Sequence, residues 1–349
     1  MDPSKQNPDT QGPLRKQDHI DLAFEARVAY TELDKRFYYE PLLAGHPDGS
    51  EDIGLNFAGK RMDAPIWVSS MTGGAARAYD INRRLARVVR TFKLGMGLGS
   101  CRHLLFDDRY LQDFDLRHEV GDQPFYGNLG IAQVEQLIAG GGAHKIENLV
   151  KRLQLDGMII HVNPLQEWIQ PEGDRIQSPP IDTIRRLLDR FPDLSLIVKE
   201  VGQGFGPASM EALINLPLEA IEFGAAGGTN FAKLESMRRA SGLSGQVPPL
   251  ATIGHSAPEM LDFLETLILD KGKTFRPHAV IVSGGIQNFL DGYYVVQRAP
   301  VSALYGQASA FLSRAASDYS SLRDFVSSQV EGLRLATKIL RIRERKRDR

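Results

Sequence analysis

The segment His161–Glu167 (sequence HVNPLQE) combines residue types that bind cations or hold and move protons. The candidates for such chemistry are His161, Asn163, Gln166 and Glu167. They follow Leu155–Ile160, an apolar run typical of a buried parallel strand, and Pro164 ends that strand because proline lacks the N–H that a sheet ladder needs. In parallel α/β folds this end of a strand faces the active site, since the strand-to-helix loops gather there. These residues alone leave open an ordinary turn followed by a helix cap.

Composition limits the class of protein. The 349 residues are enough for one barrel of about 250 residues with additions, and the 42% hydrophobic and 24% charged content is typical of a globular protein. A net charge of −1 provides no field for nucleic acid or an anionic membrane. The one cysteine, Cys101, excludes an intramolecular disulfide and multi-cysteine metal sites, and it favours a reducing cytoplasmic location. We expect neither a signal peptide nor a membrane span, because the apolar runs are too short.

Short apolar runs alternate with amphipathic stretches along most of the chain, which predicts a parallel sheet. The expected strands are Pro65–Ser70, Leu94–Gly99, Pro124–Asn128, Gly157–Val162, Leu194–Lys199, Ala220–Phe223, Ala279–Ser283 and Ser302–Tyr305. The expected helices are Ile81–Phe92, Ala132–Leu153, Ile181–Phe191, Pro207–Leu213 and Ala257–Leu269. Eight strands is the number that closes a (β/α)8 TIM barrel, so Ala251–Gly254 is interpreted as a loop.

The two ends of the chain lie outside this repeating pattern. Residues 1–60 are expected to form an N-terminal arm and a helical cover that close the barrel mouth, with helical patterning from near His19. Residues 61–349 are expected to form the barrel and a long C-terminal helix from about Ala308 to Ile342. The basic end, Arg341–Arg349, is interpreted as a solvated helix terminus, with binding to nucleic acid or an acidic surface as the alternative.

Nearly every expected strand is followed by small, glycine-rich or polar residues, which indicates that a flat or phosphorylated ligand approaches the backbone there. The last two turns, Ser283–Gly285 and Gly306–Ala308, occupy the positions where barrels frequently bind phosphate. Together with Lys199 and Asn128 they are consistent with a bound flavin mononucleotide, whose anionic reduced form a lysine would favour. The alternative for Lys199 is an ion pair with Glu200.

Taken in order, these segments resemble the type 2 isopentenyl-diphosphate isomerases, the flavin-dependent family that interconverts isopentenyl and dimethylallyl diphosphate. The matching segments are Arg15–His19, Ser70–Gly74, Gly99–Arg102, Asn128–Gly130, His161–Glu167, Lys199–Gly202, Gly227–Thr229 and Ser283–Gly285. The resemblance spans residues 15 to about 312. The MTGG and HxNxxQE elements are specific to it, whereas the glycine pairs are shared with other flavin barrels.

The resemblance implies FMN, Mg2+ and NAD(P)H as the reductant. The implied FMN contacts are Met71, Thr72, Gly73, Ser100, Asn128, Lys199, Thr229, Gly284, Gly285, Gln307 and Ala308. The implied diphosphate contacts are Arg15, Lys16, His19 and Arg102, whose charges suit a polyanion. Glu167 would ligate Mg2+, and Gln166 would lie at the reacting carbons, with His161 and Asn163 in the same pocket. Proton transfer would use the reduced flavin, with Gln166 orienting or relaying a proton. A homo-oligomer, a tetramer or octamer, is also implied.

The chain departs from the family pattern at four positions. Cys101 replaces a common glutamine, Glu222 replaces an aspartate, and Gln287 and Gln307 replace arginines near the flavin phosphate. Losing the arginines weakens a phosphate cradle, although backbone amides can carry much of it. Two other functions remain open. One is an FMN-dependent 2-hydroxy-acid oxidase, with His255 or, less suitably, His278 as its base; the other is a non-catalytic flavin-binding homologue.

Overall fold

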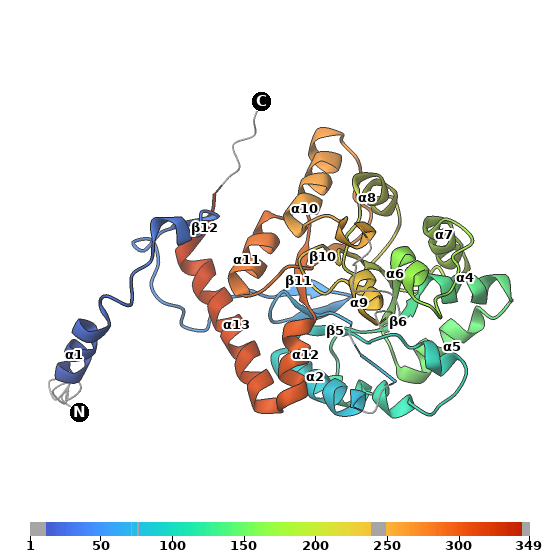
Figure 1. Cartoon of the computed structure of the whole chain (residues 1–349), viewed down its shortest axis with the longest axis horizontal. Helices are drawn as coiled ribbons and strands as arrows, with labels where there is room; N and C mark the ends of the chain where they lie inside the picture. The colour runs from blue at the N-terminus through green and yellow to red at the C-terminus, as the bar shows by residue number, and fades with distance from the viewer. Residues whose placement is uncertain (1–11, 71, 75–76, 239–248, 344–349) are drawn as a thin grey trace. The chain divides into compact units, whose positions relative to one another are not determined.

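A closed barrel of parallel strands forms the framework of residues 40–340 (Figure 1). The computed structural model describes residues 12–70, 72–74, 77–238 and 249–343. In chain order the barrel strands are β4 (Ile66–Val68), β5 (Gly95–Gly97), β6 (Phe125–Gly130), β7 (Gly157–Val162), β8 (Leu196–Glu200), β9 (Ala220–Glu222), β10 (Ala279–Ser283) and β11 (Ala303–Gln307). The last strand returns to the first, with Tyr305 opposite Ile66. The predicted (β/α)8 barrel is therefore confirmed, with all eight strands where the sequence placed them.

Helices surround the strands, whose residues are almost all buried (Figure 1). The longer helices are α2 (Ala78–Phe92), α4 (Ile131–Ala139), α5 (His144–Leu153), α6 (Pro164–Ile169), α7 (Pro180–Arg190), α8 (Pro207–Ile214), α9 (Phe231–Arg238), α10 (Ala257–Glu265), α11 (Phe289–Arg298), α12 (Ser309–Ser317) and α13 (Tyr319–Ile339). Shorter turns of helix are η2 (Arg102–Leu105), η3 (Leu111–Asp113), α3 (Arg117–Val120), η5 (Pro249–Thr252) and η6 (Thr266–Asp270). Among the described residues, none of these helices combines the length and apolarity that crossing a membrane requires.

Two predicted helices are each interrupted. The prediction of one helix over Ala132–Leu153 is wrong, because Gly140–Gly142 separates α4 from α5 and Gly141 adopts a φ of +72° that a helix cannot contain. The long C-terminal helix is present as α13, but α12 precedes it as a separate helix. Asp318 lies between them, and its carboxylate caps α13 by accepting the N–H of Ser321 (2.8 Å). Ala251–Gly254 lies in η5 and the following loop, as predicted.

Among the described residues, a second, smaller unit is formed by residues 12–39 together with 341–343. Its elements are α1 (Gly12–Leu22), η1 (Tyr30–Glu32) and β1 (Phe37–Tyr39), and β1 pairs with β12 (Leu340–Ile342). The helix begins before the predicted His19 and ends at Leu22. It carries Arg15, Lys16 and His19 at exposed positions.

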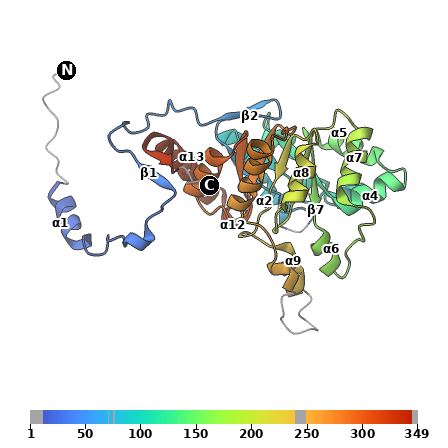
Figure 2. The same ribbon diagram turned by 90° about the horizontal axis from the view of Figure 1, so that it is seen from above.

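A hairpin of β2 (Leu55–Phe57) and β3 (Lys60–Met62) packs at the end of the barrel where the strands begin. Phe57 is buried there against Trp67 and Tyr126. Figure 2 shows the hairpin on the opposite side of the barrel from α6 and α9. Because the strands run from the hairpin side towards α6 and α9, the loops that follow the strands gather on the latter side.

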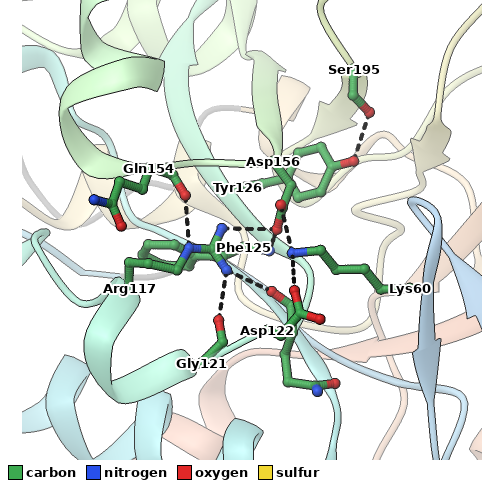
Figure 3. Close-up of polar contacts among 10 residues, drawn as sticks. Lys60, Arg117, Gly121, Asp122, Phe125, Tyr126, Gln154, Asp156 and Ser195 are labelled. Atoms are coloured by element: carbon green, nitrogen blue, oxygen red, sulfur yellow. Dashed lines mark hydrogen bonds and ion pairs between the residues drawn. The ribbon is translucent and has the colours of Figure 1, made fainter.

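The hairpin is fastened by Asp156, which precedes β7 (Figure 3). One carboxylate oxygen accepts the ammonium of Lys60 (2.7 Å), and the other accepts the guanidinium of Arg117 (2.9 Å) and the N–H of Phe125 (2.9 Å). Lys60 also meets Asp122 (3.1 Å). Four segments of the chain thus share one cluster of charges.

We expect Asp156→Ala to lower the free energy of unfolding by about 2–3 kcal/mol, because it removes the one carboxylate that two partly buried cations and the N–H of Phe125 share. Asp122→Ala is the matched control, since it removes a carboxylate from the same Lys60 but one that is 94% exposed. It should change the free energy by less than about 1 kcal/mol. Urea denaturation of both variants measures the difference, and equal losses would show that Asp156 does not fasten the hairpin.

Candidate active site

Two adjoining pockets open where the barrel strands end. The first, here called the glycine-rich pocket, has a volume of about 300 Å3 and is lined by the turns after β8, β9, β10 and β11, with Ser69 and Ser70 after β4. The second, here called the histidine pocket, has a volume of about 120 Å3 and is lined by residues at or beyond the ends of β4 to β9. They share Ser70, Lys199, Val201 and Phe231. A ligand in one pocket would therefore lie next to a ligand in the other.

Close backbone packing shapes the glycine-rich pocket. Gly284 and Gly285 have φ values of +96° and +76°, and a Cβ on Gly284 would overlap the backbone of Ala225. The turn after β10 therefore packs directly on the turn after β9, where only glycine fits. The hydroxyl of Ser283 accepts the N–H of Gly224 (3.0 Å) and joins the same two turns. On this side the pocket therefore presents backbone atoms, without side chains, to a ligand.

Buried polar atoms without partners line this pocket. Neither Gln307 Oε1 nor Ser70 Oγ has a hydrogen-bond partner among the described residues, and both side chains are buried. Ser309 and Ala310, the first residues of α12, also line it. The N–H groups at the start of a helix favour an anion, and unpaired buried polar atoms are typical of a ligand site. The glycine wall and these atoms fit a phosphorylated flat ligand.

Lys199 lies between the pockets, and its buried ion-pair partner is Glu222 on the next strand. Its ammonium donates to the backbone oxygen of Glu200 (2.9 Å) and lies 3.8 Å from Glu222 Oε1. The proposed pairing with the Glu200 carboxylate is therefore not the arrangement found. Glu222 is fully buried, accepts the Ser69 hydroxyl (2.6 Å), and has no described partner for Oε2. One buried carboxylate thus balances the lysine.

The Glu200 carboxylate instead fixes the turn after β8. One of its oxygens accepts the N–H groups of Gly202 (2.7 Å), Gln203 (2.6 Å) and Gly204 (2.9 Å). Burial raises the pKa of Glu200, although these hydrogen bonds oppose that shift. The carboxylate therefore holds the turn whose residues Val201 and Gly202 line the glycine-rich pocket.

His161 is a neutral hydrogen-bonding group in the histidine pocket. Its Nδ1 lies 2.7 Å from Asn128 Oδ1, and because an amide oxygen only accepts, Nδ1 carries the proton. Burial, assisted by the charge of Lys199, lowers the pKa of His161 to about 3. The imidazole is therefore uncharged near pH 7, and it can orient a ligand without serving as an acid.

Asn163 orders the start of α6. Its Nδ2 donates to Gln166 Oε1 (3.0 Å) and to Glu167 Oε1 (3.1 Å). Gln166 lines the histidine pocket, and Glu167 is buried with its Oε2 accepting the N–H of Asp174 (2.7 Å). Each Glu167 oxygen holds one hydrogen bond and keeps a lone pair for a cation. Within the described residues there is no group of three or more His, Cys, Asp or Glu side chains able to hold a metal.

The remaining predicted site residues fall into three groups. Those that line the pockets are Ser100, Thr229, Gly284, Gly285, Gln307 and Ala308. Thr72 and Gly73 line neither pocket as described: Thr72 accepts Asn82 Nδ2 (3.2 Å), and Gly73 packs on the ring of Phe114. Met71 lies outside the described residues.

The predicted cations for a polyanion lie on different units. Arg102 begins η2, is 41% exposed and pairs with Asp174 (3.0 Å). Arg15, Lys16 and His19 lie on α1 in the smaller unit. The contact of Asp174 with Arg102 was not predicted, because loop paths carry no sequence periodicity. The buried pair of Lys199 with Glu222 was not predicted either, although these residues are register partners on adjacent strands.

Comparison with known proteins adds relatives of known name, although no family model matches the chain. The isopentenyl-diphosphate delta-isomerase of Rickettsia africae is 31% identical over 92% of this chain and 91% of its own length. The protein of that name in Rickettsia akari is 33% identical over 90% of this chain and 88% of its own length. The one in Nostoc sp. is 31% identical over 93% of this chain and 90% of its own length.

Solved structures with a similar backbone include flavoenzymes. A mandelate oxidase variant with a monooxide FMN adduct matches with a TM-score of 0.52, at 14% identity over 88% of each chain. A flavocytochrome b2 variant with benzoylformate matches with a TM-score of 0.59, at 11% identity over 87% of this chain and 72% of that one. At such identities the likeness concerns the fold.

Proposed function

The chain belongs to the isopentenyl-diphosphate delta-isomerase family, and we propose that it interconverts isopentenyl and dimethylallyl diphosphate with reduced FMN in the glycine-rich pocket. The observation that carries the mechanism is the junction of the two pockets at Lys199. A glycine-walled site adjoins a smaller one that contains Asn128, His161 and Gln166. Such an arrangement suits a cofactor beside a small substrate.

The glycine-rich pocket would hold FMN mainly through backbone groups. The turn at Gly284 and Gly285 and the start of α12 after Ala308 offer N–H groups to a phosphate. Gln307 supplies an amide where the family pattern that the chain resembles often has an arginine, so the phosphate would rest on hydrogen bonds with little help from charge. Lys199 is the cation that would favour negative charge on the bound ring system.

The histidine pocket would bind and orient the alkene. Asn163 holds the oxygen of Gln166, so the NH2 group is the end of Gln166 that a substrate would meet. His161 is neutral and has its Nδ1–H engaged by Asn128, so neither side chain offers a strong acid near pH 7. Reduced FMN, when bound, supplies the acid–base group that adds and removes protons at the alkene carbons.

Arg102 and Glu167 would bind the diphosphate and its Mg2+. A single buried carboxylate suits Mg2+, because this ion keeps several waters and takes substrate phosphate oxygens as ligands. Arg15, Lys16 and His19 would complete the site when the N-terminal arm closes over the barrel mouth; residues 55–60 cannot take part in that cover, because their hairpin packs at the opposite end of the barrel. NAD(P)H as reductant, a tetramer or octamer, and a cytoplasmic location are the remaining parts of the proposal, and they rest on the family resemblance.

The positions of two histidines favour this function over a 2-hydroxy-acid oxidase. His255 packs on the ring of Phe263 and lies 3.6 Å from Glu259. It is not among the described residues that line either pocket. His278 immediately precedes β10, at the opposite end of the barrel, and contacts Glu219 (3.2 Å). The oxidase needs such a base beside the flavin.

Reconstitution tests the proposal directly. The purified protein should take up FMN and, when reduced by dithionite or NAD(P)H with Mg2+ present, convert isopentenyl diphosphate into dimethylallyl diphosphate, as followed by NMR. The oxidised form should be inactive. FMN uptake without turnover would indicate a non-catalytic flavin-binding protein, and oxygen consumption with 2-hydroxy acids would indicate the oxidase.

A further inference from the structure

Asp174 connects the two groups that the proposed function assigns to the diphosphate and its metal. Its Oδ2 lies 3.0 Å from Arg102 Nη1, while its backbone N–H donates to Glu167 Oε2 (2.7 Å). These contacts come from opposite sides of one residue. The distance from the Arg102 guanidinium to the Glu167 carboxylate therefore depends on the position of Asp174.

Helix α4 holds the Asp174 carboxylate in place. Gln133 Nε2 donates to Oδ2 (2.8 Å), and Gln136 Nε2 donates to Oδ1 (3.2 Å). Gln133 is buried, and the Asp174 side chain is only 18% exposed. Charge-assisted hydrogen bonds of this kind are stronger than neutral ones, so both carboxylate oxygens have fixed positions.

The loop itself does not need this carboxylate to keep its path. Further along the same loop, Glu135 accepts the N–H groups of Gln177 (2.8 Å) and Ser178 (2.6 Å). Gly173 N–H donates to Gln170 O (3.0 Å) on the side of α6. The backbone is thus anchored on both sides of Asp174, and the carboxylate is left to act on Arg102.

Arg102 keeps most of its capacity for an anion. A guanidinium has five N–H donors, and the contact with Asp174 engages one of its nitrogens, while 41% of the side chain remains exposed. We propose that Asp174 is a positioning residue that sets Arg102 and Glu167 at a fixed spacing, so that one diphosphate with its Mg2+ meets both. This inference rests on the proposed function and extends it to a residue that touches neither substrate nor cofactor.

Titration of the FMN-reconstituted protein with inorganic pyrophosphate and Mg2+, followed by calorimetry, tests this role without turnover. Asp174→Ala should weaken pyrophosphate binding at least about tenfold and raise KM for isopentenyl diphosphate similarly, with kcat within about threefold and FMN affinity unchanged. Asp174→Asn keeps the volume and should show the same split. Glu172→Ala is the matched control, since it removes a 53% exposed carboxylate of the same loop that pairs with Arg238. It should leave pyrophosphate binding unchanged.

A double-mutant cycle separates positioning from general damage. If Asp174 acts through Arg102, the variant lacking both side chains should bind pyrophosphate no more weakly than Arg102→Ala alone. Independent, multiplying losses would overturn the inference, as would wild-type pyrophosphate affinity in both Asp174 variants. A wild-type protein that binds no pyrophosphate would overturn the proposed function, and this inference with it.

Discussion

Replacing Gln166 by alanine should lower kcat for isomerisation at least about a hundredfold, while FMN affinity stays within about twofold of wild type. The reason is that Gln166 lines the histidine pocket, held there by Asn163, and is not among the residues that line the glycine-rich pocket. Removing one preorganised hydrogen-bond donor from an active site lowers kcat by about 100- to 1000-fold. Steady-state kinetics under reducing conditions and a flavin titration measure the two quantities.

Gln170→Ala supplies the matched control, because it removes the same amide from the residue that caps the end of the same short helix. It should leave kcat within about twofold of wild type. Wild-type turnover in Gln166→Ala would show that this side chain does not lie at the alkene. Loss of FMN binding in the same variant would place it against the flavin instead.

Deleting residues 1–19 should lower kcat/KM by about three orders of magnitude or more and leave the thermal unfolding of the barrel nearly unchanged. The deletion removes Arg15, Lys16 and His19, and each charge-assisted hydrogen bond to the diphosphate is worth about 1.5–3 kcal/mol. The loss is smaller than the product of three contacts if the arm closes as one unit. The barrel should persist because residues 40–340 form a compact unit of their own.

Salt and a neighbouring cation provide the controls for the deletion. Rising ionic strength should weaken substrate binding more in the intact enzyme than in the truncated one, because the contacts at issue are ionic. Arg27→Ala removes a cation of the same unit that lies beyond α1 and stacks on Phe24. It should keep kcat/KM within about threefold. Equal kcat/KM in the intact and truncated enzymes would mean that the diphosphate is held elsewhere.

The barrel strands could be predicted from the sequence because burial on both faces leaves an apolar run for each. β7 and β10 match the predicted ranges to the residue, and β6 extends two residues past its predicted end, to Gly130. The break between α4 and α5 had a signal, the three glycines 140–142, which the apolar periodicity on either side outweighed. The capping role of Asp318 is equally visible in hindsight.

In the candidate site, the sequence indicated which residues on the strands lie near one another, but not which residues the loops bring together. The sequence placed Asn128, His161 and Lys199 near the ends of successive parallel strands. His161 and Lys199 are register partners, and Asn128 precedes by two residues Gly130, the register partner of His161. Contacts made by loops were not predicted. The pairing of Asp174 with Arg102 depends on the path of a long connection, which neither periodicity nor composition encodes. Residue 71 lies outside the described residues.

Closure of the barrel by β11 against β4 has a consequence for how the protein is made. β4 leaves the ribosome early, and its partner β11 is synthesised only after every other barrel strand. Throughout translation the growing sheet therefore presents an unpaired edge, which is a template for pairing with other chains. Pairing across so long a stretch of sequence also makes folding slow. The nascent chain is most exposed to aggregation just before its final strand emerges, so a nonsense mutation shortly before Ala303 should yield insoluble product.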